Sequence, residues 1–579
     1  MNLMATILLM VLLSSCGQSS DEATSIDAAS NGSTGSSPDS VADIIFLGDN
    51  IITMDDSQVN AVAVIGDYIA ETGDTETILK LRGPDTRVIE LGERALLPGF
   101  IDAHGHFIGV AQNIDILDFS SPPVGSIESI DDIVAAIREH IEDQQIPAGQ
   151  WIYGFGYDDS LLAENRHPNR DDLDRASSNH PIVLKHVSGH LRAVNSLALT
   201  KVNITAQSEN PEGGIIRRRE GSREPDGVME ETAMRAFPWI SQEIGAQRKK
   251  QLIRIAMDIY AGYGITTVQD GGSAMGDIEL LRDMANDAAF SLDVVAFPSI
   301  NSLSDDTFDS LSYDTTYSGG FRVGGVKFML DGSPQGRTAW LSEPYTAGPP
   351  GAAADYRAYA NYSREAYESR VAIMIDRAIP ILAHANGDAA IDMMIEGISK
   401  AVTGKVTPDH RSVIIHAQLM RADQLDRVKE LGIVPSYYSV HPFFWGDWHR
   451  LSFGEQRAAF ISPVKATIDR GIPFTIHNDS PVVPPDIMRL IWVTVNRVTR
   501  SGYVLGPDQR ATVMEALHAV TLGAAYQYFE EDEKGSITPG KRADFVILQE
   551  NPLNVDVMTL ADIPIVETFS RGISVFIKQ

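Results

Sequence analysis

Cysteine is almost absent from the chain, because Cys16 is the single one among 579 residues. One cysteine cannot form an intramolecular disulfide, and no other position offers a thiolate as a nucleophile or metal ligand. Catalysis and metal binding must therefore depend on other residue types.

Positive charge is scarce as well. The chain has 47 Lys and Arg residues against 78 Asp and Glu residues, which gives a formal net charge of −31. Binding of phosphate groups depends on clustered Lys and Arg, so we expect no nucleic-acid partner and no basic face for anionic lipid. The expected partner is a small-molecule substrate. No pattern in the sequence predicts an oligomeric state.

The chain also lacks a run of about 20 apolar residues, the length that spans a bilayer. Its apolar stretch at residues 3–13 is shorter and is typical of the h-region of a signal peptide. The following Leu13-Ser-Ser-Cys16 resembles the lipobox of bacterial lipoproteins, which implies lipidation of Cys16 as the only membrane contact. The alternative is an ordinary cleaved signal with an incidental cysteine.

We therefore expect a signal peptide at residues 1–16 and an exported protein in the bacterial cell envelope or periplasm. Residues 17–41 are rich in Ser, Gly, Asp and Ala and show no hydrophobic periodicity, which predicts a flexible tether.

Eight strand-like runs alternate with helical segments in the rest of the chain, which is the pattern of βα units. These runs are residues 96–106, 265–270, 292–298, 325–330, 379–384, 412–416, 433–438 and 472–477. Eight parallel strands of this kind predict an α/β fold, a TIM-like (β/α)8 barrel. With 43% hydrophobic residues the chain can bury a core of that size.

The two ends of the chain carry further short strands, which we expect to form one small β-sandwich domain from residues 42–94 and 535–579. The barrel then occupies residues 95–534. Its first two strands are separated by far more residues than one helix needs, so we expect an inserted α/β subdomain at about residues 115–255, with a helix at 130–141.

Two histidines, His104 and His106, end the first predicted barrel strand. Alternate side chains of a strand share a face, so both imidazoles and Asp102 should point the same way. Two imidazoles at this spacing can hold one divalent metal ion.

Other potential metal ligands lie on later strands of the predicted barrel. Lys327 lies in the fourth strand, His384 and His416 end the fifth and sixth, and Asp479 follows the eighth. The carboxyl ends of barrel strands meet at one mouth, where active sites form. The sequence therefore predicts a metal site at this mouth.

An ordered set of motifs carries a family resemblance over residue 42 to the end. The motifs are Leu97-Pro-Gly-Phe-Ile-Asp-Ala-His-Gly-His106, Asn195-Ser-Leu-Ala-Leu199, Gly264-Ile-Thr-Thr-Val-Gln-Asp270, Val326-Lys-Phe-Met-Leu-Asp-Gly-Ser333, His384-Ala-Asn-Gly-Asp388, His416-Ala417, Asn478-Asp-Ser-Pro-Val482 and Gly535-Ser-Ile-Thr-Pro-Gly-Lys-Arg-Ala-Asp544. The chain resembles the amidohydrolase superfamily, and within it the Amidohydro_3 or YtcJ-like branch that includes N-substituted formamide deformylases.

The resemblance implies six metal ligands: His104, His106, Lys327, His384, His416 and Asp479. The two histidines of the first strand would bind the more buried ion, and those of the fifth and sixth strands would bind the second. Lys327 would bridge both ions as a carbamate. Neutral imidazoles with hard oxygens fit zinc, with Mn, Fe, Co or Ni as alternatives.

The chemistry of these residues is consistent with such roles. A buried lysine would carry an uncompensated charge or lose its proton, whereas reaction with carbon dioxide makes it an anionic oxygen ligand. A metal-bound water loses its proton near neutral pH and becomes a nucleophile. Asp479 would be the catalytic group that accepts this proton and passes it to the leaving nitrogen.

Other residues are candidates for contact with substrate. His190 in the inserted subdomain either reaches the substrate or is structural, and His441 and Trp445 after the seventh strand either wall a pocket or pack in the core. His477 shares a face with Asp479 and is expected behind the ligands. His167 is expected at the surface.

These observations predict a metal-dependent hydrolase that cleaves a carbon–nitrogen bond other than a peptide bond, in an amide, formamide, carbamate or cyclic imide. One alternative is a lactone or ester hydrolase of the same fold, because the same nucleophile attacks any activated carbonyl. A second alternative, from another class, is a non-catalytic envelope lipoprotein that uses the barrel to bind a ligand.

Overall fold

The computed structural model describes residues 41–240, 244–300, 303–304, 308, 310–349, 351–405 and 409–579. Residues 41–579 form one compact unit, and residues 1–40 are a separate unit. The expected signal peptide and all of the expected tether except Val41 lie outside the described residues. Among the described helices, none combines the length and apolar composition needed to cross a bilayer.

Nine parallel strands form two sheets whose strands follow one another in chain order. The first sheet consists of β6 (Phe100–Ile101), β13 (Ile265–Ser273), β14 (Asp293–Pro298) and β15 (Phe321–Val323). The second consists of β16 (Val326–Met329), β17 (Ile381–Ala385), β18 (Val413–His416), β19 (Val434–Tyr437) and β20 (Thr475–Ile476). The α/β class is as expected.

The fourth expected strand, residues 325–330, contains β16, whereas β15 was not predicted; Gly324 and Gly325 connect β15 to β16 and so separate the two sheets. Gly325 has a φ of +151°, and a Cβ added there would lie 2.2 Å from the carbonyl oxygen of Pro380. The chain bends here because only glycine fits. A parallel bridge between Ser299 and Lys327 joins the sheets across this bend.

The other edges of the two sheets meet beyond β6 and β20. The N–H of Asp479 donates to the carbonyl oxygen of His104 (3.2 Å), and the N–H of His106 donates to that of Ser480 (2.7 Å). These bonds bring the ends of the first and last strands together, and with them the residues that follow each strand.

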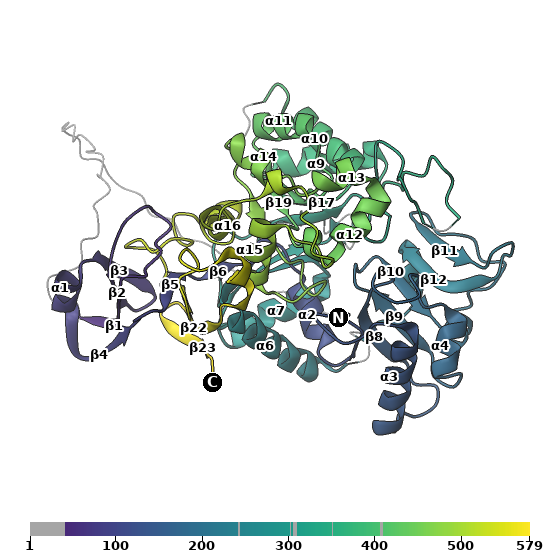
Figure 1. Cartoon of the computed structure of the whole chain (residues 1–579), viewed down its shortest axis with the longest axis horizontal. Coiled ribbons are helices and arrows are strands. Elements are labelled where there is room, and N and C mark those ends of the chain that lie inside the picture. Colours follow the sequence, from purple (N-terminus) through teal and green to yellow (C-terminus); the bar gives the residue numbers. More distant parts are fainter. Residues whose placement is uncertain are drawn as a thin grey trace, which may run out of the picture. The chain divides into compact units, whose positions relative to one another are not determined.

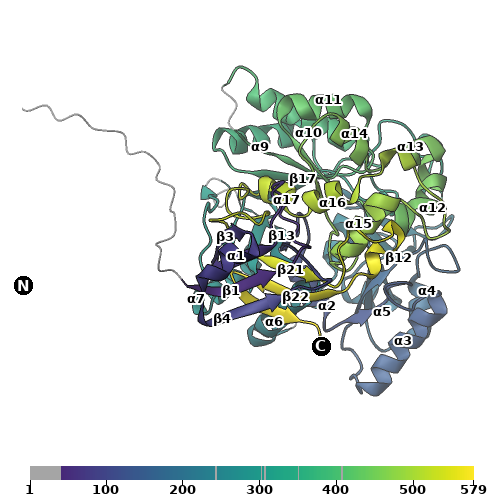
Figure 2. The ribbon, with the colours of Figure 1, turned by 60° about the vertical axis from the view of Figure 1, so that its left-hand side comes forward.

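Helices follow most of the strands and bury apolar faces against them. They include α6 (Ala246–Gly262), α7 (Met275–Asp287), α9 (Arg364–Asp376), α10 (Asp388–Val402), α11 (Ala422–Leu431), α14 (Val464–Asp469), α16 (Val513–Ala519) and α17 (Leu522–Gln527). Ile391, Met394 and Ile398 of α10 are fully buried at helical spacing. Helices α9, α10 and α11 lie together on the outer side of the second sheet (Figure 2).

Further helical elements lie elsewhere in the described chain. They include α1 (Thr75–Ile78), η1 (Leu79–Leu81), α2 (Phe107–Asn113), η2 (Thr232–Ala236), α12 (His441–Phe453), α13 (Glu455–Ala459), α15 (Ile487–Asn496), η5 (Pro507–Gln509) and η6 (Val557–Asp562).

The first expected strand, residues 96–106, is divided. Its first part, β5 (Ala95–Pro98), pairs antiparallel with β21 (Phe545–Leu548), and its second part is β6. Gly99 lies between them, where an added Cβ would be 2.4 Å from Thr266 Cγ2, and its N–H donates to the carbonyl oxygen of Asp544. The chain therefore passes from one sheet to another at Gly99.

Residues from both ends of the described chain form two four-stranded sheets. One has the order β3 (Tyr68–Gly73), β2 (Ala61–Ile65), β1 (Ala42–Leu47), β4 (Arg82–Glu90), and the other β23 (Ile573–Ile577), β22 (Ile565–Ser570), β21, β5. The Phe46 ring lies 5.1 Å from that of Phe545 and 5.2 Å from that of Phe569. The two sheets thus share an aromatic core.

The segment between β6 and β13 forms a six-stranded mixed sheet with helices, drawn in blue in Figure 1. The strand order is β11 (Gly214–Arg218), β12 (Pro225–Glu231), β10 (Leu191–Val194), β9 (Ile182–His186), β8 (Ile152–Tyr157), β7 (Leu117–Asp118), and the helices are α3 (Ile130–Asp143), α4 (Arg170–Ala176) and α5 (Ser196–Lys201). We call this the inserted sheet. The domain bounds drawn from the sequence stay predictions.

The Asn195-Ser-Leu-Ala-Leu motif has a structural explanation in this sheet. The Asn195 side chain caps α5 by accepting from the N–H of Ala198 (3.0 Å), and it donates to the carbonyl oxygen of His180 (2.9 Å).

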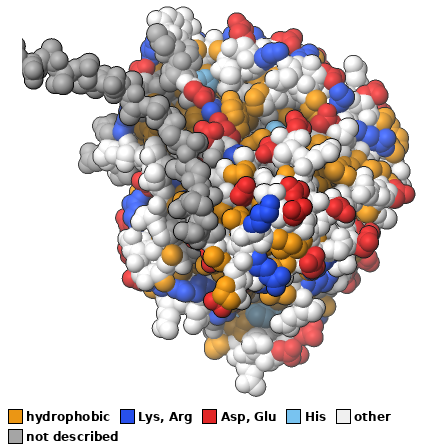
Figure 3. Space-filling view, turned by 90° about the vertical axis from the view of Figure 1, so that its left-hand side faces the viewer, with side chains coloured by type: hydrophobic (Ala, Val, Ile, Leu, Met, Phe, Trp, Pro, Cys, Tyr) orange, Lys and Arg blue, Asp and Glu red, His pale blue; other side chains and the backbone are white. Residues whose placement is uncertain are grey.

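The face in Figure 3 carries Asp and Glu side chains interspersed with Lys and Arg rather than a single basic patch.

Candidate metal centre and active site

The structure brings the six expected ligand side chains into one cluster at the carboxyl ends of the strands. They are His104, His106, Lys327, His384, His416 and Asp479. All are buried except His106, which is half-buried. His104, His384 and His416 have pKa values well below the usual range because burial disfavours the charged ring. Neutral imidazole is the form that binds metal ions.

Asp479 lies between the two histidines that follow β6. Its Oδ1 is 3.5 Å from Nε2 of His104 and 3.3 Å from Nε2 of His106. The ligand atoms of the three residues lie within 4.8 Å of one another, and among the described residues Asp479 Oδ1 is buried without a hydrogen-bond partner. Burying such an oxygen beside two ring nitrogens lowers the free energy of unfolding unless a cation is bound between these atoms. This donor set fits a divalent metal ion.

Lys327 joins this group from β16. Its Nζ donates to Nε2 of His104 at 2.8 Å. Burial lowers the pKa of Lys327 to about 7, although the charge of Asp479 acts in the opposite direction. A neutral amine is the form that reacts with carbon dioxide, so this position fits a carbamate ligand.

The other two histidines lie against each other, with Nε2 of His416 2.9 Å from Nδ1 of His384. Nε2 of His384 donates to the carbonyl oxygen of Gly332 (3.0 Å), which leaves Nδ1 for a ligand. β18 ends at His416 with a φ of 78°, and Asp479 has a φ of 54°. Backbone strain of this kind is typical of functional sites.

Two residues behind the ligands fix the orientation of the rings. Nδ1 of His104 donates to Oε1 of Gln269, while Nε2 of Gln269 donates to the carbonyl oxygen of Ala103 (3.0 Å). Nε2 of His104 therefore faces the cluster. On the other side His477 contacts Nδ1 of His416 at 3.1 Å, behind the ligands as expected. The contact of Gln269 with His104 was not predicted from the sequence, although Gln269 belongs to the Gly264–Asp270 motif.

Asp102 does not point with the two histidines as expected. An added Cβ at Gly105 would lie 2.6 Å from Asp102 Oδ2, so this carboxyl lies beneath Gly105. The regular strand ends at Ile101, and strict alternation of faces ends with it. Burial, and to a smaller extent the charge of Asp479, raises the pKa of Asp102 to about 7.

A cavity of about 740 Å³ opens over the cluster. One side is lined by His106, Lys327, His384, His416 and Asp479, and the other by residues of the inserted sheet and its loops, including Lys185, His190, Arg192 and Trp239. This combination of ligand side chains and mixed polar and apolar walls is typical of a site for a small molecule.

His190 faces the ligands from the inserted sheet. Its ring centroid is 5.1 Å from that of His384, and its Nδ1 is 2.9 Å from Oε2 of Glu231. Burial acts to lower its pKa, but Glu231, together with Asp331 and Asp479, outweighs this effect, and the pKa is raised. His190 therefore presents a ring to the cavity, held by a carboxylate.

His441 and Trp445 lie in α12 and are not among the residues that line this cavity. Nδ1 of His441 is 2.7 Å from Nε2 of His449, and Nε1 of Trp445 donates to Oδ2 of Asp158 (2.6 Å). The His441 ring packs against Tyr438, at 4.7 Å between centroids, and Tyr438 stacks on His477. Both residues are thus placed behind Tyr438.

The expectation of a surface position for His167 is wrong, because this side chain is only 9% exposed. Its Nε2 lies 3.5 Å from Oδ2 of Asp159, whose Oδ1 lies 3.0 Å from Nε2 of His186. Ser188 donates its N–H to Nδ1 of His186 (3.2 Å), so Nε2 carries the proton toward Asp159. The N–H of His190 in turn donates to Oγ of Ser188. This buried trio supports the turn that carries His190.

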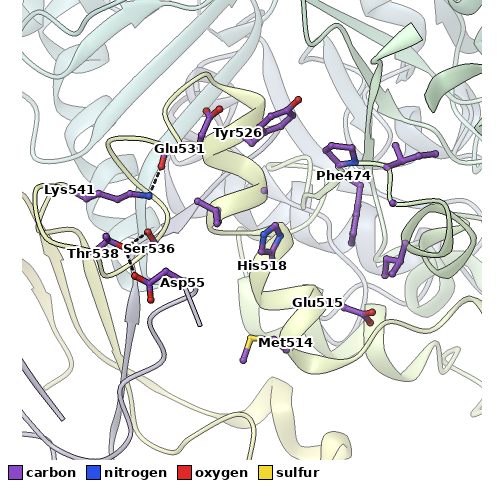
Figure 4. A pocket seen from close by; sticks show the side chains of 16 residues that line it. Asp55, Phe474, Met514, Glu515, His518, Tyr526, Glu531, Ser536, Thr538 and Lys541 are labelled. Atoms are coloured by element: carbon purple, nitrogen blue, oxygen red, sulfur yellow. Dashed lines mark hydrogen bonds between the residues drawn. The ribbon is translucent and has the colours of Figure 1, made fainter. Parts of the chain in front are cut away.

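A larger cavity of about 860 Å³ lies at the opposite end of β20, beside residues 471–474 that precede the strand (Figure 4). Its lining is mainly apolar and contains one imidazole, His518. Thr538 and Asp55 form a hydrogen bond at its rim. Among the described residues, its acidic side chains and His518 do not form a group of three ligand atoms close enough to hold a metal ion, so this cavity does not compete as the active site.

Residues 87–576 match the model of the amidohydrolase family Amidohydro_3. The chain is 29% identical to N-substituted formamide deformylase of Arthrobacter pascens, over 92% of this chain and 98% of that protein. It is 27% identical to the putative amidohydrolase YtcJ of Bacillus subtilis (strain 168), over 92% and 99%.

Two solved structures of metal-dependent hydrolases have the same fold. The one from Pyrococcus furiosus has a TM-score of 0.66 at 24% identity and covers 88% of this chain and 100% of its own. The one from Pyrococcus horikoshii OT3 has a TM-score of 0.69 at 22% identity and covers 89% and 99%.

Proposed function

The chain belongs to the amidohydrolase family, in its YtcJ-like branch, and from this premise we propose that this metal-dependent enzyme hydrolyses a carbon–nitrogen bond other than a peptide bond. The substrate is an amide, formamide, carbamate or cyclic imide. The observation that carries the proposal is the convergence of six ligand side chains, one of which, Asp479, has an oxygen without a hydrogen-bond partner beside His104 and His106. The relative from Arthrobacter pascens is, by its name, a deformylase of N-substituted formamides.

The ligands divide into two groups. His104, His106 and Asp479 would hold one ion, while His384 and His416 would hold a second. Lys327, carboxylated on Nζ, would supply oxygen ligands to both. Zinc is the proposed metal, with Mn, Fe, Co or Ni as alternatives, since affinity alone does not choose among them. The metal supplies Lewis-acid activation of a water molecule and of the scissile carbonyl.

Asp479 moves the proton. Its carboxylate faces the cavity beside His106 and is free of hydrogen bonds from the described residues, so it can accept the proton of the attacking water. It then delivers that proton to the leaving nitrogen, which departs as an amine. His190, held by Glu231, is placed to contact the substrate from the other wall.

The proposal includes an architecture and a location. The two parallel sheets act as one closed (β/α)8 barrel, the two sheets from the chain ends as a β-sandwich domain, and the inserted sheet as a subdomain over the mouth. The protein is exported and anchored to the cell envelope through a lipid on Cys16.

A substrate panel tests the reaction. Metal-loaded protein is assayed for amine release from N-alkylformamides, acetamides and carbamates, for ring opening of cyclic imides to the half-amide acid, and for hydrolysis of a lactone and an ester of matched size. The matched control is Asp479→Asn. Amine release by the parent and its loss in the variant are expected. Turnover of the lactone or ester alone, or of nothing by protein with full metal content, contradicts the proposal.

A further inference from the structure

Two basic side chains project side by side from the inserted sheet into the cavity over the cluster. Lys185 of β9 and Arg192 of β10 are directly opposite each other in the antiparallel pair, and directly opposite residues share a face. Both line the cavity that contains Asp479 and Lys327. Nζ of Lys185 is 5.8 Å from the ring centroid of Trp239, and the Arg192 guanidinium is 5.0 Å from it.

Neither cation forms an ion pair with a carboxylate in the part of the chain that the structure describes. Lys185 contacts the rings of Phe155 and Trp239. Arg192 donates from one terminal nitrogen to the carbonyl oxygens of Met234 (3.0 Å) and Phe237 (2.9 Å), while its Nε is buried without a partner. This is unusual in a chain with 78 acidic and 47 basic residues, where carboxylates are plentiful.

Two adjacent, half-buried cations without a counter-charge are costly. Burial, followed by the repulsion from Arg192, lowers the pKa of Lys185 to about 8, and burial lowers that of Arg192 to about 10. An anion brought by a ligand would relieve this cost. Both side chains remain accessible to such a ligand, because both are partly exposed and line the cavity.

Resting on the proposed hydrolase function, we propose that Lys185 and Arg192 form a subsite for a carboxylate of the substrate, so that the enzyme acts on N-acylated amino acids or similar amides that carry a carboxylate. Lys185 supplies an ammonium point charge, and Arg192 supplies the donors that are not used by backbone carbonyls. A carboxylate has two oxygens, one for each cation. The face of Trp239 beside both cations accommodates the apolar part of such a substrate.

Binding tests the subsite without any need for turnover. The probes are N-methanesulfonylphenylalanine and N-methanesulfonylphenethylamine, sulfonamides that differ only in the carboxylate and lack the scissile carbonyl. Calorimetry on metal-loaded protein should give at least tenfold tighter binding of the carboxylated probe. Lys185→Met should abolish this preference, and Lys201→Met, at an exposed position on α5, should keep it.

Kinetics separate this inference from the proposed function. N-Formylphenylalanine and N-(2-phenylethyl)formamide form a matched substrate pair. Lys185→Met should lower kcat/KM for the carboxylated member, through KM, at least tenfold more than for the neutral one, with unchanged metal content. If nothing in the substrate panel is cleaved but the binding preference holds, the proposed reaction is wrong and the subsite stands. Equal binding of both probes by the parent, or an equal loss for both in Lys185→Met, overturns the subsite.

Discussion

Nζ of Lys327 lies 2.8 Å from Nε2 of His104 and donates a hydrogen bond to it. Lys327 lies in β16 of the second sheet, and His104 follows β6 of the first. This contact places an amine within the cluster of imidazoles, where burial lowers its pKa and the charge of Asp479 opposes this effect.

Lys327→Ala should remove the bridging ligand. We expect the metal content, about two ions per chain in a bridged two-metal site, to fall substantially, and added short carboxylic acids to restore part of it by replacing the carbamate oxygens. Plasma mass spectrometry of desalted protein measures the content. Lys201→Ala is the control, and a Lys327→Ala protein with parental metal content would refute the bridging role.

Asp479→Asn keeps the size and one ligating oxygen of the side chain but cannot accept a proton. Turnover of any substrate found in the panel should fall by about 10²-fold or more, the usual scale of general acid–base catalysis, while most of the metal and the circular dichroism spectrum remain. A folded, metal-loaded variant with nearly parental turnover would assign the proton transfer elsewhere.

Gln269→Leu removes the acceptor that holds Nδ1 of His104. Metal affinity should decrease by about 10- to 100-fold, the usual effect of losing such an orienting partner. Competition with a chromophoric chelator measures it. Gln269→Glu keeps an acceptor at the same place and should retain most of the affinity, so an equal loss in both variants would argue against the orienting role.

The pKa of His167 is lowered to about 3 by burial, with Asp159 opposing the shift. Because the folded state binds this proton less readily than the unfolded state, the stabilisation is fully present above about pH 6.5 and declines as the pH falls toward 3. Acidification from pH 7 to pH 5 should therefore lower the free energy of unfolding by about 2 kcal/mol through this histidine.

Thermal midpoints at pH 7 and pH 5 measure this effect. His167→Gln should lose less stability on acidification than the parent, and His140→Gln on α3 should behave like the parent. Identical pH dependence in all three proteins would contradict the assignment to His167.

Cys16→Ser tests the anchor. Full-length protein expressed in a Gram-negative host should partition with membranes, and the variant should lose the lipid and appear in the soluble envelope fraction. Membrane association that is unchanged in the variant would disprove the lipoprotein hypothesis.

The cluster could be located from the sequence because its residues follow buried strands, and the carboxyl ends of parallel strands meet. Local sequence alone does not predict where the chain passes from one sheet to another. Gly99 and Gly325 mark such points only because Thr266 and Pro380 approach them closely in space. The same limit applies to His167, whose burial depends on Asp159 and His186.

Side-chain pairs between neighbouring strands could not be predicted from the sequence for the same reason. Lys185 and Arg192 are seven residues apart in the printed sequence, and their opposition follows from the register of β9 with β10. His441 and Trp445 follow β19 as expected from the sequence, but they begin a helix that turns them behind Tyr438. Their role as substrate contacts stays a prediction.

The pairing of β5 with β21 limits how early this part of the protein can fold during its synthesis. A ribosome releases β5 early and β21 near the end of synthesis, so the segment at Gly99, where the chain passes from one sheet to another, lacks its neighbour for most of translation. The nascent chain therefore cannot complete this part of its native structure before its last strands emerge. Until then, the backbone groups of β5 that pair with β21 lack that partner strand.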